Sequence, residues 1–229
     1  MALYDRDYTT TASSTYIQES ASVGFIKKTY QLLAASMIAA AAGAYATMPY
    51  AMEIMQYKWF IFGAEMLVLF FGLSATRGKP GLNLAMLFIF TFLTGVSIVP
   101  LLAMLIGIGK GAVIGNAFLM TSVLFGALSM FAINSKSDFS SWGKPLFITM
   151  IVVFIASLVN YFFIESSIMS IVITAVILIL FSFFTIYDTQ NIANGLYDSP
   201  VDAAVSLYID FFNMFVSLLQ LLGLWGSDD

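Results

Sequence analysis

Long apolar segments separated by short polar connections make up most of the chain after residue 24. Each segment approaches the roughly 20 helical residues that cross a hydrocarbon core of about 30 Å. The apolar runs are continuous and do not alternate, which favours helices over membrane-barrel strands. The seven predicted segments are 28–48, 58–75, 83–106, 112–133, 146–164, 168–187 and 201–224. We therefore predict an all-α polytopic membrane protein with seven transmembrane helices.

The first 24 residues differ from everything that follows. They are polar, rich in Thr, Ser and Tyr, and lack the apolar core of a signal peptide. We interpret 1–24 as a mobile polar cytoplasmic tail and 25–229 as a single seven-helix transmembrane domain. Within that domain, Pro100 predicts a kink in the third helix, and the run of small residues at 34–43 predicts close helix contact.

The basic residues predict the orientation in the membrane. Seven of the nine fall on one side of the predicted spans: Arg6, Lys27, Lys28, Arg77, Lys79, Lys136 and Lys144. Only Lys58 and Lys110 fall on the other side. Because cytoplasmic loops carry the excess of Lys and Arg, the N-terminus is predicted to be cytoplasmic. Seven spans then place the C-terminus outside, in the periplasm of a bacterium.

Composition excludes several classes of function. The chain is 60% hydrophobic and 10% charged, against about 25% charged residues in soluble domains. It has no Cys and no His, which excludes disulfides, Cys/His zinc sites, Ser–His proteases and HExxH metalloproteases. An aspartyl intramembrane protease stays conceivable, although the residues before Asp210 do not match that class. We expect no enzyme activity, no stable cofactor and no nucleic-acid partner.

The last segment carries a polar stripe of helical period. Its members fall in an arc of about 80° at 100° per residue, and they are Asp202, Ser206, Asp210, Asn213, Ser217 and Gln220. A helix lying on the membrane surface, interhelical hydrogen bonding without transport, and a polar cavity or ion path could each explain it. Surface helices usually have a Lys/Arg-rich polar face, and this one has none. We favour the cavity or ion path.

Asp188 and Asp210 lie in or beside apolar segments, where an ionisable residue is a functional candidate by default. No Lys or Arg lies between them. A weaker polar arc on the sixth segment predicts that the two helices face each other. Straight helices place Asp188 at the cytoplasmic boundary and Asp210 about 14 Å deeper, so contact requires tilt, a broken helix or a later start of the seventh helix.

Two carboxyl groups in contact would titrate as a coupled pair and could share a proton or bind a cation. Ca²⁺ suits such a site because it prefers carboxylate and carbonyl oxygens. Acidification would protonate the pair and weaken cation binding. The prediction is therefore a pH sensor and transient Ca²⁺ site at Asp188 and Asp210.

Two further charges are candidates. Glu65 lies within the second segment, where a paired structural acid and a functional acid are both open interpretations. Arg77 ends the same segment on the cytoplasmic side. It is either a positive-inside anchor or a latch that pairs with Asp188, which is predicted at the same depth.

Tyr187-Asp188-Thr189-Gln190 and the later Leu207-Tyr208-Ile209-Asp210-Phe211-Phe212-Asn213, on seven spans with an acid in the second, resemble the transmembrane Bax inhibitor motif family. The size and the Ser/Thr-rich tail look like its bacterial branch. The resemblance implies a bundle with the last helix central, surrounded by the other six. It also implies a pH-sensitive Ca²⁺ leak with Asp188 and Asp210 as sensor, and Arg77 as latch. Some relatives have a basic residue late in the seventh span that would pair with the acid at Glu65, and this chain has Gln220 in that region.

Three functions remain open at this point. The first is a passive cation leak for Ca²⁺, gated by the two aspartates, in a bacterial inner membrane. The second is a non-transporting regulator that binds a membrane-anchored ATP-dependent protease, or another membrane partner, through the polar tail. The third is a proton-coupled transporter.

Overall fold

The computed structural model describes the backbone of residues 5–224 and the side chains of residues 22–223. All regular structure in this part is helical. The elements are α1 (Asp5–Thr47), η1 (Met48–Tyr50), α2 (Ala51–Gln56), α3 (Lys58–Leu67), η2 (Val68–Gly72), α4 (Leu73–Ala75), α5 (Pro80–Ser97), α6 (Val99–Gly107), α7 (Ala112–Asn134), η3 (Ser140–Trp142), α8 (Gly143–Val159), η4 (Asn160–Ile164), α9 (Ser167–Ala193) and α10 (Pro200–Leu224). Most of the predicted tail at 1–24 falls outside the described side chains, so its mobility stays a prediction.

Seven stretches of the described helices are long and apolar enough to cross a membrane, as predicted. The kink in the third span is also confirmed. α5 ends at Ser97 and α6 begins at Val99, with Pro100 in its first turn, because proline cannot donate the backbone hydrogen bond that would continue the helix. The second span contains a π-helical turn, η2, which joins α3 to α4.

The sixth span continues further than its apolar run predicts. It was expected to end at residue 187, but α9 continues to Ala193. Its last polar residues are buried and have partners on the α7–α8 side. Gln190 accepts a hydrogen bond from the backbone N–H of Phe139 and donates one to the carbonyl of Ser137, and the Thr189 hydroxyl meets that of Ser129. Protein contacts therefore stabilise a polar helical end that hydropathy alone assigns to a loop.

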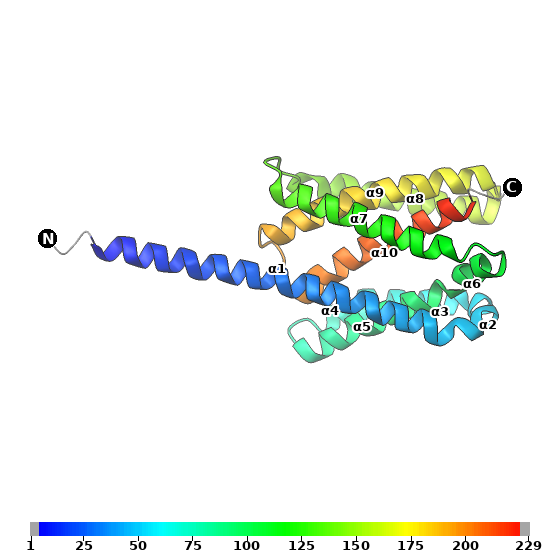
Figure 1. The fold of residues 1–229 in the computed structure, drawn as a ribbon, viewed down its shortest axis with the longest axis horizontal. Coiled ribbons are helices and arrows are strands. Elements are labelled where there is room, and N and C mark those ends of the chain that lie inside the picture. Colours follow the sequence, from blue (N-terminus) through cyan, green and yellow to red (C-terminus); the bar gives the residue numbers. More distant parts are fainter. Residues whose placement is uncertain (1–4, 225–229) are drawn as a thin grey trace.

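The last helix occupies the centre of the bundle. In Figure 1, α10 runs obliquely between α1, α3, α4 and α5 on one side and α7, α8 and α9 on the other. It packs directly against α1, α5, α7 and α9, while α3 packs on α5 and α8 packs on α9. The side chains of Leu207, Met214 and Leu219 are completely buried. This placement excludes a membrane-surface helix as the explanation of the polar stripe.

Small residues allow α1 and α5 to approach closely. A Cβ atom at Gly95 of α5 would overlap the carbonyl of Ala40 in α1, and one at Gly43 would overlap the carbonyl of Phe92. The predicted close contact of the small-residue run is therefore made with α5. This contact holds one wall of the bundle against α10.

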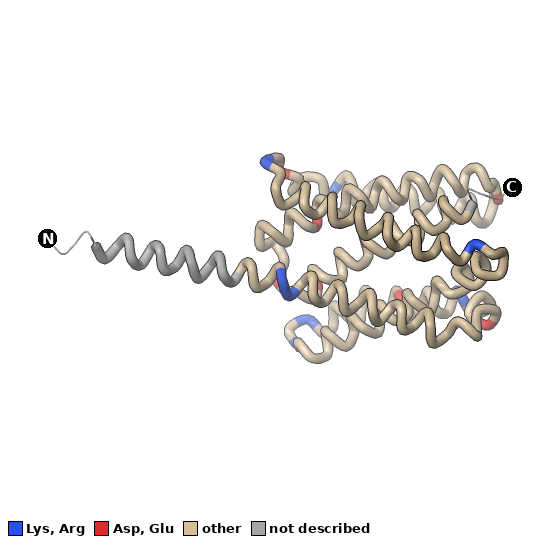
Figure 2. The backbone as a smooth tube through the Cα atoms, viewed as in Figure 1, with Lys and Arg blue, Asp and Glu red and all other residues tan. Residues whose placement is uncertain are grey.

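Charged positions gather at the two ends of the bundle, and few lie in its middle (Figure 2). This distribution is what a hydrocarbon layer around the middle of the helices requires, because charge at membrane depth is costly. The acids that do lie between the ends are the ones that need a functional explanation.

Candidate functional site

The two predicted aspartates meet at the contact between α9 and α10. Asp188 is 7% exposed and Asp210 is 2% exposed. Their carboxyl groups lie within hydrogen-bonding distance of each other. Two carboxylates at this separation repel strongly, so the contact requires a proton or a cation between them. The arrangement can therefore exchange a proton for a metal ion on the same oxygen atoms.

The structure also shows how the predicted difference in depth is overcome. The chain passes from Ala193 to Pro200 in a short connection, and α10 then runs obliquely into the bundle (Figure 1). Because α9 continues beyond Asp188, that residue lies inside the helix and not at its end. The extended α9 and the tilt of α10 bring the two side chains to the same level.

Tyr197 closes the pair on the side of the α9–α10 connection. Its hydroxyl donates a hydrogen bond of 2.9 Å to Oδ1 of Asp188 and also lies in hydrogen-bonding contact with Ser206. Burial raises the pKa of Tyr197 above its ordinary value of 10, so it remains a protonated donor throughout the neutral range. Tyr197 was not among the residues predicted from the sequence. The available signal was a single aromatic hydroxyl in the short connection between two acid-bearing helices.

Asp210 has a spare acceptor. Its Oδ2 atom is buried and has no hydrogen-bond partner among the described residues. Buried polar atoms without a partner are uncommon, and they call for an explanation such as an ion or a water. No cluster of three or more acidic side chains surrounds it in the part of the chain that the structure describes. The site can thus offer a metal two carboxylates and hydroxyl oxygens, which fits brief occupancy better than tight retention.

The rest of the polar stripe is distributed along the α9–α10 contact. Ser206 contacts Tyr197, and Gln220 accepts a 3.2 Å hydrogen bond from Thr174 of α9. Asn213 bonds to the carbonyl of Ile209 in its own helix, and Ser217 is buried. The stripe therefore meets α9 at Asp210 and Gln220, and it meets the α9–α10 connection at Ser206. Asp202, the remaining member, lies at the start of α10.

Glu65 occupies a separate buried region. It is 6% exposed on α3, contacts Ser97 of α5, and has an Oε1 atom without a partner among the described residues. The nearby Tyr208 hydroxyl bonds to that of Thr94. Tyr208 and Asp210 are two residues apart on α10 and point about 160° apart. Glu65 therefore lies across α10 from the aspartates. Gln220 does not pair with Glu65 in this structure, because its hydrogen-bond partner is Thr174 of α9.

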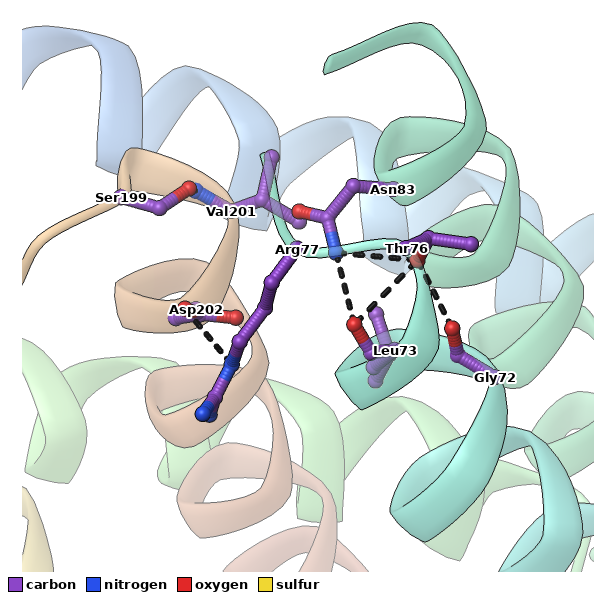
Figure 3. Close-up of polar contacts among 8 residues, drawn as sticks. All are labelled: Gly72, Leu73, Thr76, Arg77, Asn83, Ser199, Val201 and Asp202. Atoms are coloured by element: carbon purple, nitrogen blue, oxygen red, sulfur yellow. Dashed lines mark hydrogen bonds and ion pairs between the residues drawn. The ribbon is translucent and has the colours of Figure 1, made fainter. Parts of the chain in front are cut away.

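Arg77 pairs with a different acid from the one predicted. Its Nε atom lies 3.5 Å from Oδ2 of Asp202, in the first turn of α10 (Figure 3). The predicted partner, Asp188, is buried and already accepts a hydrogen bond from Tyr197, whereas Asp202 is partly exposed in the first turn of α10. In this structure Arg77 therefore pairs with Asp202. A latch to Asp188 stays a prediction for another state of the protein.

Comparisons with known proteins agree with this architecture. A family model described as Inhibitor of apoptosis-promoting Bax1 matches residues 23–227. A Helicobacter pylori J99 protein is 47% identical over the whole of both chains. A Vibrio cholerae membrane protein is 33% identical over 89% of this chain and 91% of its own. The Escherichia coli K12 inner membrane protein YbhL is 30% identical over 63% of this chain and 64% of its own.

The family match covers all seven spans, including both aspartates and Glu65. The relatives from Helicobacter and Vibrio are aligned over nearly their full lengths, so the similarity extends well beyond one motif. The chain therefore belongs to the Bax inhibitor-1 family of membrane proteins.

Proposed function

We propose that this protein is a pH-sensitive cation leak, with Ca²⁺ as the favoured ion, gated by Asp188 and Asp210. The observation that carries the proposal is the contact between two buried carboxyl groups from adjacent transmembrane helices. Such a pair holds a proton in the closed contact, because two ionised carboxylates at that distance repel. Loss of the proton leaves two acidic oxygens that separate or bind a cation.

Tyr197 determines how the pair communicates with the cytoplasm. A cleft of about 1460 Å³ is lined by Tyr197, Ser206 and Asn213, but Asp188 and Asp210 do not line it. The Tyr197 side chain stands between the cleft and the pair and is bonded to Asp188. In our proposal this is the closed state, and movement of Tyr197 away from Asp188 opens the cytoplasmic end of the path.

The proposed location is a bacterial inner membrane, as the name of the Escherichia coli relative, inner membrane protein YbhL, suggests. The N-terminus is on the cytoplasmic side because six of the eight basic residues after Arg6 lie at that end of the spans. The proposal assigns the chain no catalytic step. Ca²⁺ is its transported ion and not a resident cofactor.

The test is Ca²⁺ flux into proteoliposomes between pH 5 and pH 8, which spans the range in which a coupled carboxyl pair can titrate. The wild type is expected to show flux that falls on acidification, because protons displace the cation. Asp210→Asn should abolish this pH dependence. The matched control is Asp138→Asn, which removes an exposed acid from the α7–α8 connection and should leave the profile unchanged.

Two outcomes would overturn the proposal. An unchanged pH profile in Asp210→Asn would remove the pair from gating. Absence of flux at every pH would favour a non-transporting membrane regulator. The tail would then be identified as its contact if a protease copurifies with the wild type but not with a chain lacking residues 1–24. Uphill accumulation of a solute driven by a pH gradient would point to a proton-coupled transporter.

A further inference from the structure

The cleft of about 1460 Å³ is lined by apolar side chains of the second and fifth spans as well as by α10. One side of α10 is left uncovered where α3, η2 and α4 of the second span stand apart from α8 of the fifth. Val205, Ile209 and Asn213, at four-residue spacing on α10, form its floor. Phe70 of η2 and Phe154 of α8 stand on opposite walls, 62% and 51% exposed. These exposed aromatic rims show that the cleft opens sideways into the hydrocarbon layer.

The depth of this groove matches one leaflet. It extends from the start of α10 at the cytoplasmic end to Phe62, Ser157 and Asn213 at its deep end. Counted from the end of α4 and the starts of α8 and α10, each of these three lies 13 or 14 residues along its helix, which is about 20 Å at 1.5 Å per residue. Half of a hydrocarbon core is about 15 Å. An acyl chain of the cytoplasmic leaflet would therefore lie within the groove along its full length.

The deep part of the groove is apolar in its chemistry. Its two polar side chains each make a hydrogen bond inside their own helix, since the Ser157 hydroxyl donates to the carbonyl of Val153 and the Asn213 amide donates to the carbonyl of Ile209. The groove therefore offers an occupant methyl and aromatic contacts, and a hydrocarbon chain can supply the matching surface. A polar solute would lose its own hydrogen bonds there.

The cytoplasmic mouth is different, because charged side chains from three parts of the chain meet there. Lys28 of α1 and Arg77 after α4 line this end together with the acids Asp198 and Asp202. Arg77 uses its Nε atom for Asp202 and is 68% exposed, so its terminal nitrogens remain accessible (Figure 3). Guanidinium groups bind phosphate oxygens in a fork, and basic pockets between helices on the cytoplasmic side bind lipid headgroups.

We infer that the groove between the second and fifth spans binds one phospholipid of the cytoplasmic leaflet, with an acyl chain along α10 and the phosphate at Lys28 and Arg77. The phosphodiester is the part of the headgroup that the basic side chains recognise. Asp198 gives the mouth an acceptor that suits the ammonium of phosphatidylethanolamine. This inference goes beyond the proposed leak and does not depend on it.

Native mass spectrometry of the purified full chain tests the acyl-chain contact. The wild type is expected to retain one added phosphatidylethanolamine or phosphatidylglycerol. Ser157→Trp fills the deep end and should lower retention by about tenfold or more. Ile155→Trp is the matched control, because Ile155 lies on the same helix at the same depth, is 53% exposed and does not line the groove. Equal retention by Ser157→Trp and the wild type, or equal loss in both variants, would overturn the inference.

The headgroup contact has its own matched pair. Lys28→Gln should weaken phospholipid retention by about fivefold, the contribution of one lysine near a headgroup. Lys27→Gln, which changes an exposed neighbour that does not line the groove, should leave it unchanged. Diacylglycerol with the same acyl chains should be retained less well than either phospholipid. Equal retention of diacylglycerol would overturn the role assigned to the phosphate.

Photolabelling of the wild type tests the same contact without any substitution in the chain. A phospholipid with a photoreactive acyl chain should label the α10 peptide that contains Val205 and Ile209, because both residues line the groove. Labelling confined to the outer face of α8 would overturn the inference. So would a Ser157→Trp variant that changes the oligomeric state and not lipid retention, since the groove would then be a contact with a second copy.

Discussion

α10 carries buried polar groups on two opposite faces, and the two faces differ in one respect. On one face, Asp210 meets Asp188 of α9. On the other face, the hydroxyl of Tyr208 meets Thr94 of α5, close to Glu65 of α3. Both regions therefore contain an acid buried between helices. Only the first brings two acids into contact.

In the proposed mechanism, burial alone does not make an acid a switch. At the aspartate pair, a proton or a cation determines whether two carboxyl groups attract or repel, so the packing of α9 on α10 depends on what occupies the site. Glu65 contacts a hydroxyl that is already donated to the carbonyl of Thr94. Its protonation changes the energy of one side chain without an adjacent acid to repel.

The largest effect expected from this comparison is a gain in thermal stability when Glu65 is replaced by Met. Glu65→Met removes a buried acid whose Oε1 atom has no partner among the described residues, and it preserves length and flexibility. An unsatisfied buried polar atom costs about 1–3 kcal/mol, so the thermal midpoint in detergent should rise accordingly. The pH dependence of Ca²⁺ flux should keep its midpoint, because the aspartate pair is untouched.

Glu65→Gln is the companion variant, since it keeps the size and polarity of the side chain and removes only the charge. It should leave stability between those of the wild type and Glu65→Met. A fall in stability in both variants would show that Glu65 holds an ion or water that the protein needs. The comparison between the two faces of α10 would then be wrong, and Glu65 would join the path.

Most of the fold could be predicted from the pattern of apolar residues, because membrane-spanning helices must be long and must satisfy their own hydrogen bonds. The break next to Pro100 followed from the chemistry of proline. The end of α9 did not, because the polar residues Thr189 and Gln190 have partners 50 to 60 positions earlier in the chain. Such long-range bonds leave no local pattern.

The site was predicted in part. The period of α10 placed Asp210 on the face that meets α9, but it could not reveal the register of α10 against α9, so the contact with Asp188 needed the structure. Tyr197 and the partner of Arg77 were missed for the same reason. Both depend on how the connection between Ala193 and Pro200 folds back over the bundle. Glu65 was found as an intramembrane acid, but its separation from the aspartates follows from packing alone.

A smaller effect is expected at Tyr197. Tyr197→Phe removes the hydroxyl that donates to Asp188 and keeps the ring. That hydrogen bond favours the ionised carboxylate, so its loss favours the protonated pair. The midpoint of the flux profile should therefore move to higher pH by about one unit, which corresponds to 1.36 kcal/mol. Tyr187→Phe is the matched control, since the Tyr187 hydroxyl lies against Gly143 of α8. A shift in the control as large as that in Tyr197→Phe would remove Tyr197 from the site.

The smallest effect is expected at Arg77, and it separates an anchor from a latch. The ion pair with Asp202 is open to solvent on the Arg77 side, and exposed pairs contribute about 0–1 kcal/mol and weaken with salt. Arg77→Gln should therefore lower the thermal midpoint only slightly. Lys79→Gln, in the same connection, is the matched control and should have a similarly small effect. If Arg77 only anchors the second span, both variants should keep the wild-type flux profile. A large rise in flux at neutral pH in Arg77→Gln alone would mean that Arg77 leaves Asp202 for Asp188 in a closed state. In that case the Arg77 guanidinium supplies the positive charge that the Asp188–Asp210 pair lacks in this structure. The aspartate pair and the Glu65 region then differ in their access to a positive side chain as well as in the number of acids.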